Sequence, residues 1–256
     1  MKIYSTLLMA LLVLCSVTLT AKERQFYQIK IYHLKTQDQV TLVDNYLEKA
    51  FLPALHQAGI KQAGVFKPVT PDTADLRIYV LIPFESLNQF VNLDKTLASN
   101  KSFGVNGKDY ADAAWNNIPY TRIESILLQA FPGMPLLQAP SLTAPKQERV
   151  YELRSYESPS ENYHINKVKM FNTGDEIGIF RNLHFNAVFY ASVISGSRMP
   201  NLMYMTTFNN KEDRDEHWKA FSADPKWKAL SAMEEYSHNV SKSDILFLRP
   251  TNYSDL

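Results

Sequence analysis

Arg24-Gln25-Phe26-Tyr27-Gln28-Ile29-Lys30-Ile31-Tyr32 recurs 124 positions later in the chain as Glu148-Arg149-Val150-Tyr151-Glu152-Leu153-Arg154-Ser155-Tyr156. The same offset brings the segment 76–84 onto the segment 200–208, with Phe84 falling on Phe208. These segments are rich in aromatic and branched apolar residues, as strands are. Two strand-like segments that keep one offset indicate a duplicated unit, so the chain is predicted to contain two related domains.

The composition is typical of a soluble globular protein. Of the 256 residues, 45% are hydrophobic and 21% are charged, and the length gives each copy enough residues for a core. The 27 basic and 26 acidic residues nearly cancel, and no basic stripe stands out. Nucleic acid is therefore not an expected partner. After the first residues, no stretch is long and apolar enough to span a membrane.

Residues 1–21 have the layout of a secretory signal peptide. Lys2 supplies the positive start, an apolar run covers residues 7–14, and small and polar residues follow up to Ala21. We therefore expect export to the periplasm or the medium; a buried N-terminal helix is the alternative. Cys15 is the only cysteine, and export with a lipid attached at Cys15 is a further alternative. A lipoprotein signal places a small residue before its cysteine, and Leu14 is not small.

The hydrophobic periodicity predicts the same order of elements in both copies. In the first copy we expect strands at 26–33, 60–69, 76–83 and 122–128, with helices at 37–58 and 86–98. In the second copy we expect strands at 150–156, 183–194, 202–208 and 245–248, with helices at 161–180 and 211–236, the latter interrupted at Asp224-Pro225. The order β-α-β-β-α-β is the ferredoxin-like unit, and the fold class is α+β.

The copies are joined by a proline-rich segment. The predicted boundaries are 1–21 for the signal peptide, 22–130 for the first domain, 131–147 for the linker and 148–256 for the second domain. The linker carries Pro132, Pro135, Pro140 and Pro145, a density that excludes a helix or a central strand. Residues 99–120 have no clear counterpart in the second copy. We expect this insertion to be a lid over a substrate site or to pack against the other domain.

Two motifs of the second copy allow comparison with a known family. They are the strand Tyr151-Glu152-Leu153-Arg154 and the helix break Trp218-Lys219-Ala220-Phe221-Ser222-Ala223-Asp224-Pro225-Lys226-Trp227. With the ending at 247–254, they make the segment 148–254 resemble the NIPSNAP family. The first copy fits only loosely, because the segment 84–100 lacks the Asp-Pro-x-Trp piece.

The resemblance implies the dimeric α+β barrel superfamily, in which two ferredoxin-like units pair sheet to sheet. In this chain the tandem units are expected to form that barrel within one molecule, as a monomer with an internal pseudo-dimer or as a homodimer. The superfamily includes small monooxygenases and haem-degrading enzymes. NIPSNAP members have no agreed catalytic set, so the resemblance implies no catalytic residue here.

Alternation along the predicted strands separates an apolar face from a mixed polar face. We expect the helices to cover the apolar face and the mixed face to line the barrel interior. The candidate ligand-binding residues on the mixed faces are Arg77, Arg122, Glu152, Arg154, Tyr156, His184, Asn186 and Tyr190. The arginines would hold an anionic group, His184 would exchange protons, and the tyrosines would stack or donate. The alternative is that these charges form ion pairs along a sheet that packs or faces solvent.

Other site chemistries find no support in the sequence. The histidines show no metal-ligand spacing, no phosphate-binding glycine loop is present, and no serine-hydrolase motif occurs. We therefore expect no metal or other cofactor. The leading hypothesis is an exported protein that binds a small organic ligand in a barrel cavity. The alternatives are a cofactor-independent oxygenase or isomerase acting through His184 and Arg154, and an interaction module that uses the insertion around Trp115.

Overall fold

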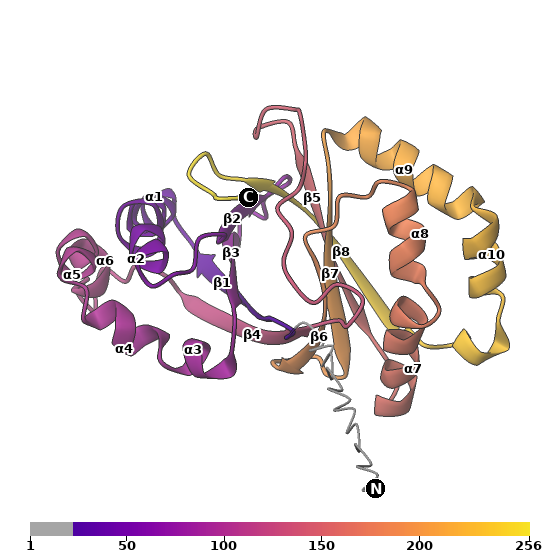
Figure 1. Ribbon diagram of the computed structural model, residues 1–256. Coiled ribbons are helices and arrows are strands. Elements are labelled where there is room, and N and C mark those ends of the chain that lie inside the picture. Colours follow the sequence, from indigo (N-terminus) through magenta and orange to yellow (C-terminus); the bar gives the residue numbers. More distant parts are fainter. Residues whose placement is uncertain (1–22) are drawn as a thin grey trace, which may run out of the picture.

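The computed structural model describes residues 23–256, so the predicted signal peptide 1–21 and Cys15 lie outside the described residues. Eight antiparallel strands close into one barrel, drawn as the central arrows in Figure 1. Their bounds are β1 Phe26–Leu34, β2 Gly64–Pro68, β3 Leu76–Phe84, β4 Arg122–Ala130, β5 Val150–Glu157, β6 Phe189–Ser195, β7 Asn201–Phe208 and β8 Lys242–Pro250.

The order of strands around the barrel reflects the duplication. The order is β1-β3-β2-β8-β5-β7-β6-β4, so β1 to β4 form one ferredoxin-like sheet and β5 to β8 form the other. The two sheets join where β2 pairs with β8 and where β4 pairs with β6. The predicted fold class is confirmed: two tandem βαββαβ units form a dimeric α+β barrel within one chain.

The repeat seen in the sequence is preserved in the strand register. Phe26 lies opposite Phe84 in the β1–β3 pair, and Val150 lies opposite Phe208 in the β5–β7 pair. Each of these residues is related to its counterpart by the offset of 124 positions. The duplicated segments therefore occupy the same pairing positions in both sheets.

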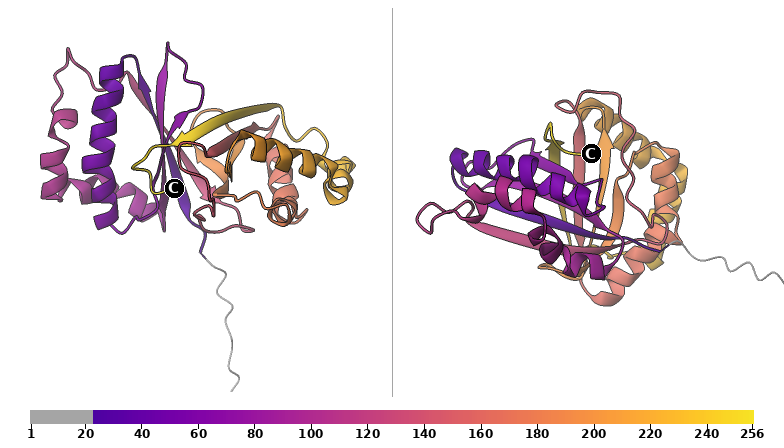
Figure 2. Two further views of the ribbon diagram at one scale, coloured as in Figure 1. Left: turned by 90° about the horizontal axis from the view of Figure 1, so that it is seen from above. Right: turned by 60° about the vertical axis from the view of Figure 1, so that its left-hand side comes forward.

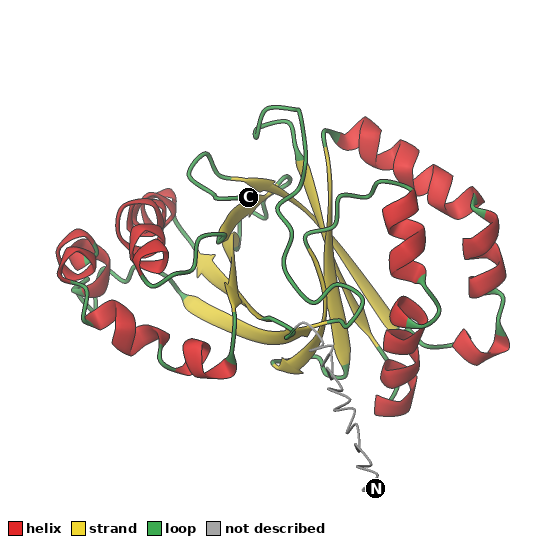
Figure 3. Cartoon of the chain, viewed as in Figure 1, coloured by secondary structure: helices red, strands yellow, loops and turns green. Residues whose placement is uncertain are grey.

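Helices cover the outside of the barrel on two opposite sides (Figures 2 and 3). The first side carries α1 Gln37–Tyr46, the π-helical turn η1 Leu47–Phe51, α2 Leu52–Gln57, α3 Leu87–Val91, α4 Leu93–Ala98, α5 Lys101–Asn106 and α6 Lys108–Ala111. The second side carries α7 Glu161–Asn172, α8 Glu176–Asn182, α9 Lys211–Ala223, α10 Pro225–Ser231 and the 3₁₀ turn η2 Glu234–Tyr236. Within residues 23–256, no helix has the length and hydropathy that a membrane crossing requires.

Local chemistry explains where several helices begin and end. Thr36 caps α1 by accepting a hydrogen bond from the backbone N–H of Gln39 at 3.2 Å. Asp224 ends α9 and caps α10 by accepting from Lys226 and Trp227, which confirms the predicted break at Asp224-Pro225. The helix predicted at 161–180 is two helices, because Asp175 has a left-handed backbone with φ of 63° between α7 and α8.

The insertion 99–120 packs on the helices of its own half, so the expected lid or contact with the other domain is wrong. Pro53 has no N–H, which leaves the carbonyl of Lys49 without its helical donor. Asn106 of α5 supplies that donor at 3.1 Å. Tyr110 of α6 stacks on Tyr46 of α1 with ring centroids 3.8 Å apart. The insertion therefore completes the first helical layer.

The barrel interior is filled by apolar side chains from all eight strands. In the first half, Tyr79 and Leu81 point inward, whereas Ile78, Val80 and Ile82 lie under the helices, as the alternation predicts. Leu137, Leu142 and Leu256 pack against one end of this interior cluster. The linker and the C-terminus therefore close that end of the barrel.

In the second half, the predicted orientation of the two faces is wrong. Tyr151 and Leu153 of the apolar face point into the barrel, and Phe189, Ala191 and Val193 join them there. Glu152 and Arg154 lie on the opposite face beneath α9, and Tyr156, Tyr190 and Tyr204 pack with the helices. The charged face tolerates this burial because α9 supplies hydrogen-bonding partners for it.

Candidate functional site

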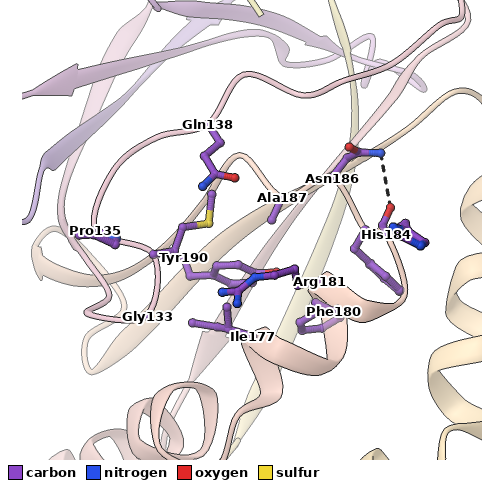
Figure 4. Close-up of a pocket in the computed structure, with 12 residues that line it drawn as sticks. Gly133, Pro135, Gln138, Ile177, Phe180, Arg181, His184, Asn186, Ala187 and Tyr190 are labelled. Atoms are coloured by element: carbon purple, nitrogen blue, oxygen red, sulfur yellow. Dashed lines mark hydrogen bonds between the residues drawn. The ribbon is translucent and has the colours of Figure 1, made fainter.

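A pocket of about 270 Å³ lies on the outer side of the second sheet, between the segment 133–138, α8 and the turn that precedes β6 (Figure 4). Its floor is apolar and is built by Met134, Ile177, Phe180, Phe185 and Tyr190. Its polar side chains are Gln138, Arg181, His184 and Asn186. An apolar floor with a few polar groups around it is the usual composition of a small-molecule site.

The linker is held against the strand that carries Tyr190. The backbone N–H of Phe131 donates to the carbonyl of Tyr190 at 2.8 Å, and that of Gln138 donates to the carbonyl of Val188 at 3.0 Å. These two bonds fix the linker wall of the pocket relative to its floor. A segment without a helix or strand of its own is thereby ordered.

The turn at 184–186 has an uncommon backbone. His184 and Asn186 both have left-handed conformations, with φ of 57° and 44°. Residues other than glycine adopt this region uncommonly, although Asn and His do so more readily than most, and the conformation persists where the surroundings enforce it. The prediction of a strand from 183 is therefore wrong for residues 183–188, since β6 begins at Phe189.

Contacts on both sides of the turn hold this conformation. Phe185 is buried and packs edge-on against Trp218 of α9, with ring centroids 5.0 Å apart. Thr207 of β7 donates its hydroxyl to the carbonyl of Asn186 at 2.7 Å. The buried phenyl ring and this bond fix the backbone, so that His184 and Asn186 sit at the pocket.

The electrostatics of the pocket are set by Arg181. Arg181 is exposed in the last turn of α8 and makes no ion pair or side-chain hydrogen bond within residues 23–256. Burial raises the pKa of Tyr190, the charge of Glu176 raises it further, and Arg181 acts in the opposite direction. Tyr190 therefore stays protonated at neutral pH and can donate a hydrogen bond. The pocket combines a positive charge with neutral donors.

The eight predicted site residues are divided among three places. His184, Asn186 and Tyr190 meet at the pocket. Glu152, Arg154 and Tyr156 belong to a buried network between β5 and α9. Arg77 and Arg122 lie at one end of the barrel in the first half. His184 and Arg154, which the catalytic alternative pairs, share no pocket and no contact among the described residues.

The buried network is centred on Glu152, which has no exposed surface. Its carboxylate accepts hydrogen bonds from Arg154 at 2.6 Å, from Arg214 at 2.7 and 2.9 Å, and from the indole of Trp218 at 2.8 Å. The guanidinium of Arg154 lies 3.6 Å from the Trp218 ring centroid and donates to Tyr156 at 2.8 Å. All of these polar groups are paired with one another, so the network stabilises the packing of α9.

At the barrel end, the two arginines are also paired. Arg77 donates to Asp75 at 2.7 Å, and Arg122 lies 3.3 Å from Glu124. His33 is buried between the two carboxylates, with its ring nitrogens 2.9 Å from Asp75 and 3.1 Å from Glu124. These contacts fit the alternative drawn from the sequence, in which the charged residues form ion pairs along the sheet.

Sequence reasoning missed several residues of the pocket and of the network. Arg181 and Gln138 were not singled out, and Trp218 was named only in the helix-break motif, without its bond to Glu152. A signal for Arg181 existed, because it lies three residues before the candidate His184, directly after the helix predicted at 161–180. Gln138 gave no signal, since only tertiary packing brings the linker to β6. Within residues 23–256, no group of three or more His, Asp or Glu side chains is arranged to hold a metal ion.

The architecture defines the class of protein: an α+β barrel built from two ferredoxin-like halves. Two solved structures have this fold along almost the whole chain. A proposed monooxygenase from Lactobacillus acidophilus NCFM aligns with a TM-score of 0.58 at 12% identity, covering 89% of this chain and 94% of its own. A second proposed monooxygenase, from Fusobacterium nucleatum subsp. nucleatum ATCC 25586, aligns with a TM-score of 0.54 at 8% identity, covering 89% and 93%.

The second half of the chain matches a known family. Residues 151–255 match the NIPSNAP family model, so the C-terminal half of the chain is a NIPSNAP domain. A NIPSNAP family protein from Agrobacterium tumefaciens C58 is similar at 19% identity over 46% of this chain and 98% of its own, with a TM-score of 0.38. No curated protein matches the sequence.

Proposed function

We propose that this protein binds a small organic anion in the pocket formed by α8, the turn 184–186 and the linker. The observation that carries the proposal is Arg181, a guanidinium at the edge of an apolar pocket for which residues 23–256 supply no counter-ion. A bound carboxylate would supply that counter-ion, and Gln138, Asn186 and Tyr190 offer neutral hydrogen bonds to the same ligand.

The backbone of the turn supports a binding role. His184 and Asn186 are held in the left-handed region by packing on α9 and by a bond to β7, and conformations of this kind persist where the surroundings enforce them. A pocket whose walls are already ordered loses little conformational entropy on binding. We therefore expect the ligand to enter a preformed site.

The first experiment is native mass spectrometry of the full chain purified gently from the envelope fraction of its own cells. We expect a reproducible extra mass of small-molecule size, which is lost in Arg181→Gln. In parallel, titration calorimetry with benzoate as the probe and benzyl alcohol as its neutral match should give binding of benzoate only. Arg181→Gln is expected to weaken benzoate binding by about tenfold or more, since a charge-assisted hydrogen bond contributes about 1.5–3 kcal/mol.

The control variants come from the same chain. His238 is exposed and left-handed like His184, with φ of 58°, but lies outside the pocket. His184→Ala should weaken benzoate binding, and His238→Ala should leave it unchanged. Arg249 is exposed and lies outside the pocket, so Arg249→Gln is the control for Arg181→Gln and should also leave benzoate binding unchanged. Equal binding of benzoate by Arg181→Gln and the wild type would contradict the proposal.

Export is the second part of the proposed function. It is supported by the charged start, apolar run and small residues of 1–21. N-terminal sequencing of the protein recovered from the envelope or the medium tests it. A start near Lys22 is expected, and a full-length protein found only in the cytosol would contradict export.

A further inference from the structure

The end of the barrel opposite the linker contains a second cavity, of about 320 Å³. Its walls continue the apolar barrel interior. Ile31, Tyr79 and Ile126 come from the first half, and Leu153, Met203 and Leu246 come from the second half. Because both halves line it, this cavity exists only in the closed barrel.

The two ends of the barrel differ in what covers them. Leu137 of the linker and the C-terminal Leu256 are buried in the interior cluster at one end. At the other end the cavity is bordered by charged side chains, namely Arg77, Glu124, Arg198 and Asp244. An apolar interior with a charged border at its open end suits a ligand that has an apolar body and one charged group.

The border offers hydrogen-bond donors more readily than acceptors. Each carboxylate already contacts two nitrogen-bearing side chains: Glu124 lies 3.1 Å from His33 and 3.3 Å from Arg122, and Asp244 is paired with Arg198 and lies 3.8 Å from Lys242. Arg77, in contrast, has Asp75 as its one carboxylate partner in the described part of the chain.

Arg198 has the most donor capacity left. Its Nη1 is used by Asp244 and lies 3.8 Å from Glu157, whereas its Nε and Nη2 make no hydrogen bond within residues 23–256. The side chain is 41% exposed and comes from the turn between β6 and β7, where the Arg198 backbone is left-handed with φ of 66°. A guanidinium binds a carboxylate with two parallel hydrogen bonds when two of its donors are available.

We propose that the open end of the barrel binds an amphipathic carboxylate of the medium-chain fatty acid type. The alkyl chain lies between Tyr79, Leu153 and Met203, and the carboxylate is held by Arg198 with Arg77 beside it. The cavity volume is at the low end for small-molecule sites, which fits a medium chain rather than a long one. This site shares no lining residue with the pocket of Arg181, so the two proposals stand or fall independently.

The test is titration calorimetry of the full chain with octanoate as the probe and 1-octanol as the neutral match. Octanoate should bind, and hexanoate should bind more weakly, by about fourfold for each methylene removed. Arg198→Gln is expected to weaken octanoate binding by about tenfold or more, whereas Arg198→Lys retains part of the affinity because it keeps the charge.

Two control variants separate this site from its surroundings. Arg249 is exposed and does not line the cavity, so Arg249→Gln should leave octanoate binding unchanged. Arg181→Gln should also leave it unchanged. Equal binding of octanoate and 1-octanol, or affinity that does not depend on chain length, would overturn the proposal. Loss of octanoate binding in Arg181→Gln but not in Arg198→Gln would place the carboxylate in the other pocket and would also overturn it.

Discussion

The indole Nε1 of Trp218 donates a hydrogen bond to the carboxylate of Glu152 at 2.8 Å, and this bond joins α9 to β5 inside the protein. Glu152 is fully buried and accepts from Arg154 and Arg214 as well. Trp218 therefore has two roles: its indole covers the charged face of the strand and also satisfies the carboxylate of Glu152.

Replacing Glu152 by Gln should therefore destabilise the fold. Gln retains the shape and an acceptor for Trp218, but it leaves the buried guanidinium of Arg154 and the partly buried one of Arg214 without their counter-charge. Removing one partner of a buried ion pair typically costs about 3–5 kcal/mol. Urea denaturation of the full chain measures the change in the free energy of unfolding. Asp215→Asn, which removes an exposed partner of Arg214, is the control and should shift the midpoint far less.

Glu152 should also make the stability depend on acid pH. Burial alone would raise the pKa of Glu152, but hydrogen bonds and charge from Arg214 and Arg154 outweigh it and lower the pKa below the ordinary value of 4.5. A lowered pKa means that the stabilisation is present above pH 4.5 and is lost as the pH falls through the folded-state pKa. The difference in unfolding free energy between the wild type and Glu152→Gln should shrink on acidification below pH 4.5. A difference that stays constant down to pH 3 would contradict this assignment.

The Lys167–Glu176 pair should behave as a replaceable buried ion pair. The two charges are 3.0 Å apart and both residues are buried. Burial raises the pKa of Glu176, against the opposing charge of Lys167. We expect Glu176→Leu alone to cost about 3–5 kcal/mol, and the double variant Lys167→Met, Glu176→Leu to be neutral or to gain about 1–4 kcal/mol.

The pH dependence gives this pair a second readout. A raised pKa means that the stabilising contribution of Glu176 to the free energy of unfolding is present below pH 4.5. It is lost as the pH rises through the folded-state pKa. The free energy of unfolding of the double variant should therefore exceed that of the wild type by more at pH 7 than at pH 4. Urea denaturation at the two pH values checks this, and a double variant as unstable as the single one would refute it.

The insertion should contribute to stability through Tyr110. Its ring stacks on Tyr46 at 3.8 Å, so Tyr110→Ala removes an aromatic contact and leaves a cavity in the first helical layer. The expected cost is about 3 kcal/mol. Trp115 in the same insertion is 90% exposed, and Trp115→Ala should change the unfolding free energy by less than about 0.5 kcal/mol. Thermal and urea unfolding of the two variants compare them directly.

Much of the architecture was predictable because its signals are local. Strand alternation, the turn residues and the break at Asp224-Pro225 each depend on neighbours in sequence. The repeat added a long-range constraint, since Phe84 and Phe208 had to occupy equivalent pairing positions. Alternation failed at 183–188, where the apolar and polar residues still alternate but His184 and Asn186 are left-handed.

The candidate site was predictable only in part. His184, Asn186 and Tyr190 were singled out as one face of a strand, and they do meet, although they meet at a turn and a strand end on the outside of the barrel. Gln138 and Leu137 are adjacent in the linker, yet one lines the pocket and the other lies in the barrel interior. Nothing in a proline-rich segment indicates which of its residues will be buried.

By itself, then, the sequence determined that two ferredoxin-like units occur in tandem and that the second is a NIPSNAP domain, because repeat spacing and short motifs are properties of the chain alone. Which face of β5 and β6 turns inward was decided by the tertiary structure. Alternation defines two faces but not their environments: Glu152 lies outside the barrel because Arg214 and Trp218, more than sixty residues away, compensate its burial. The cavity at the open end exists only in the closed barrel, since both halves line it, whereas the pocket of Arg181 needs the linker to pack on β6.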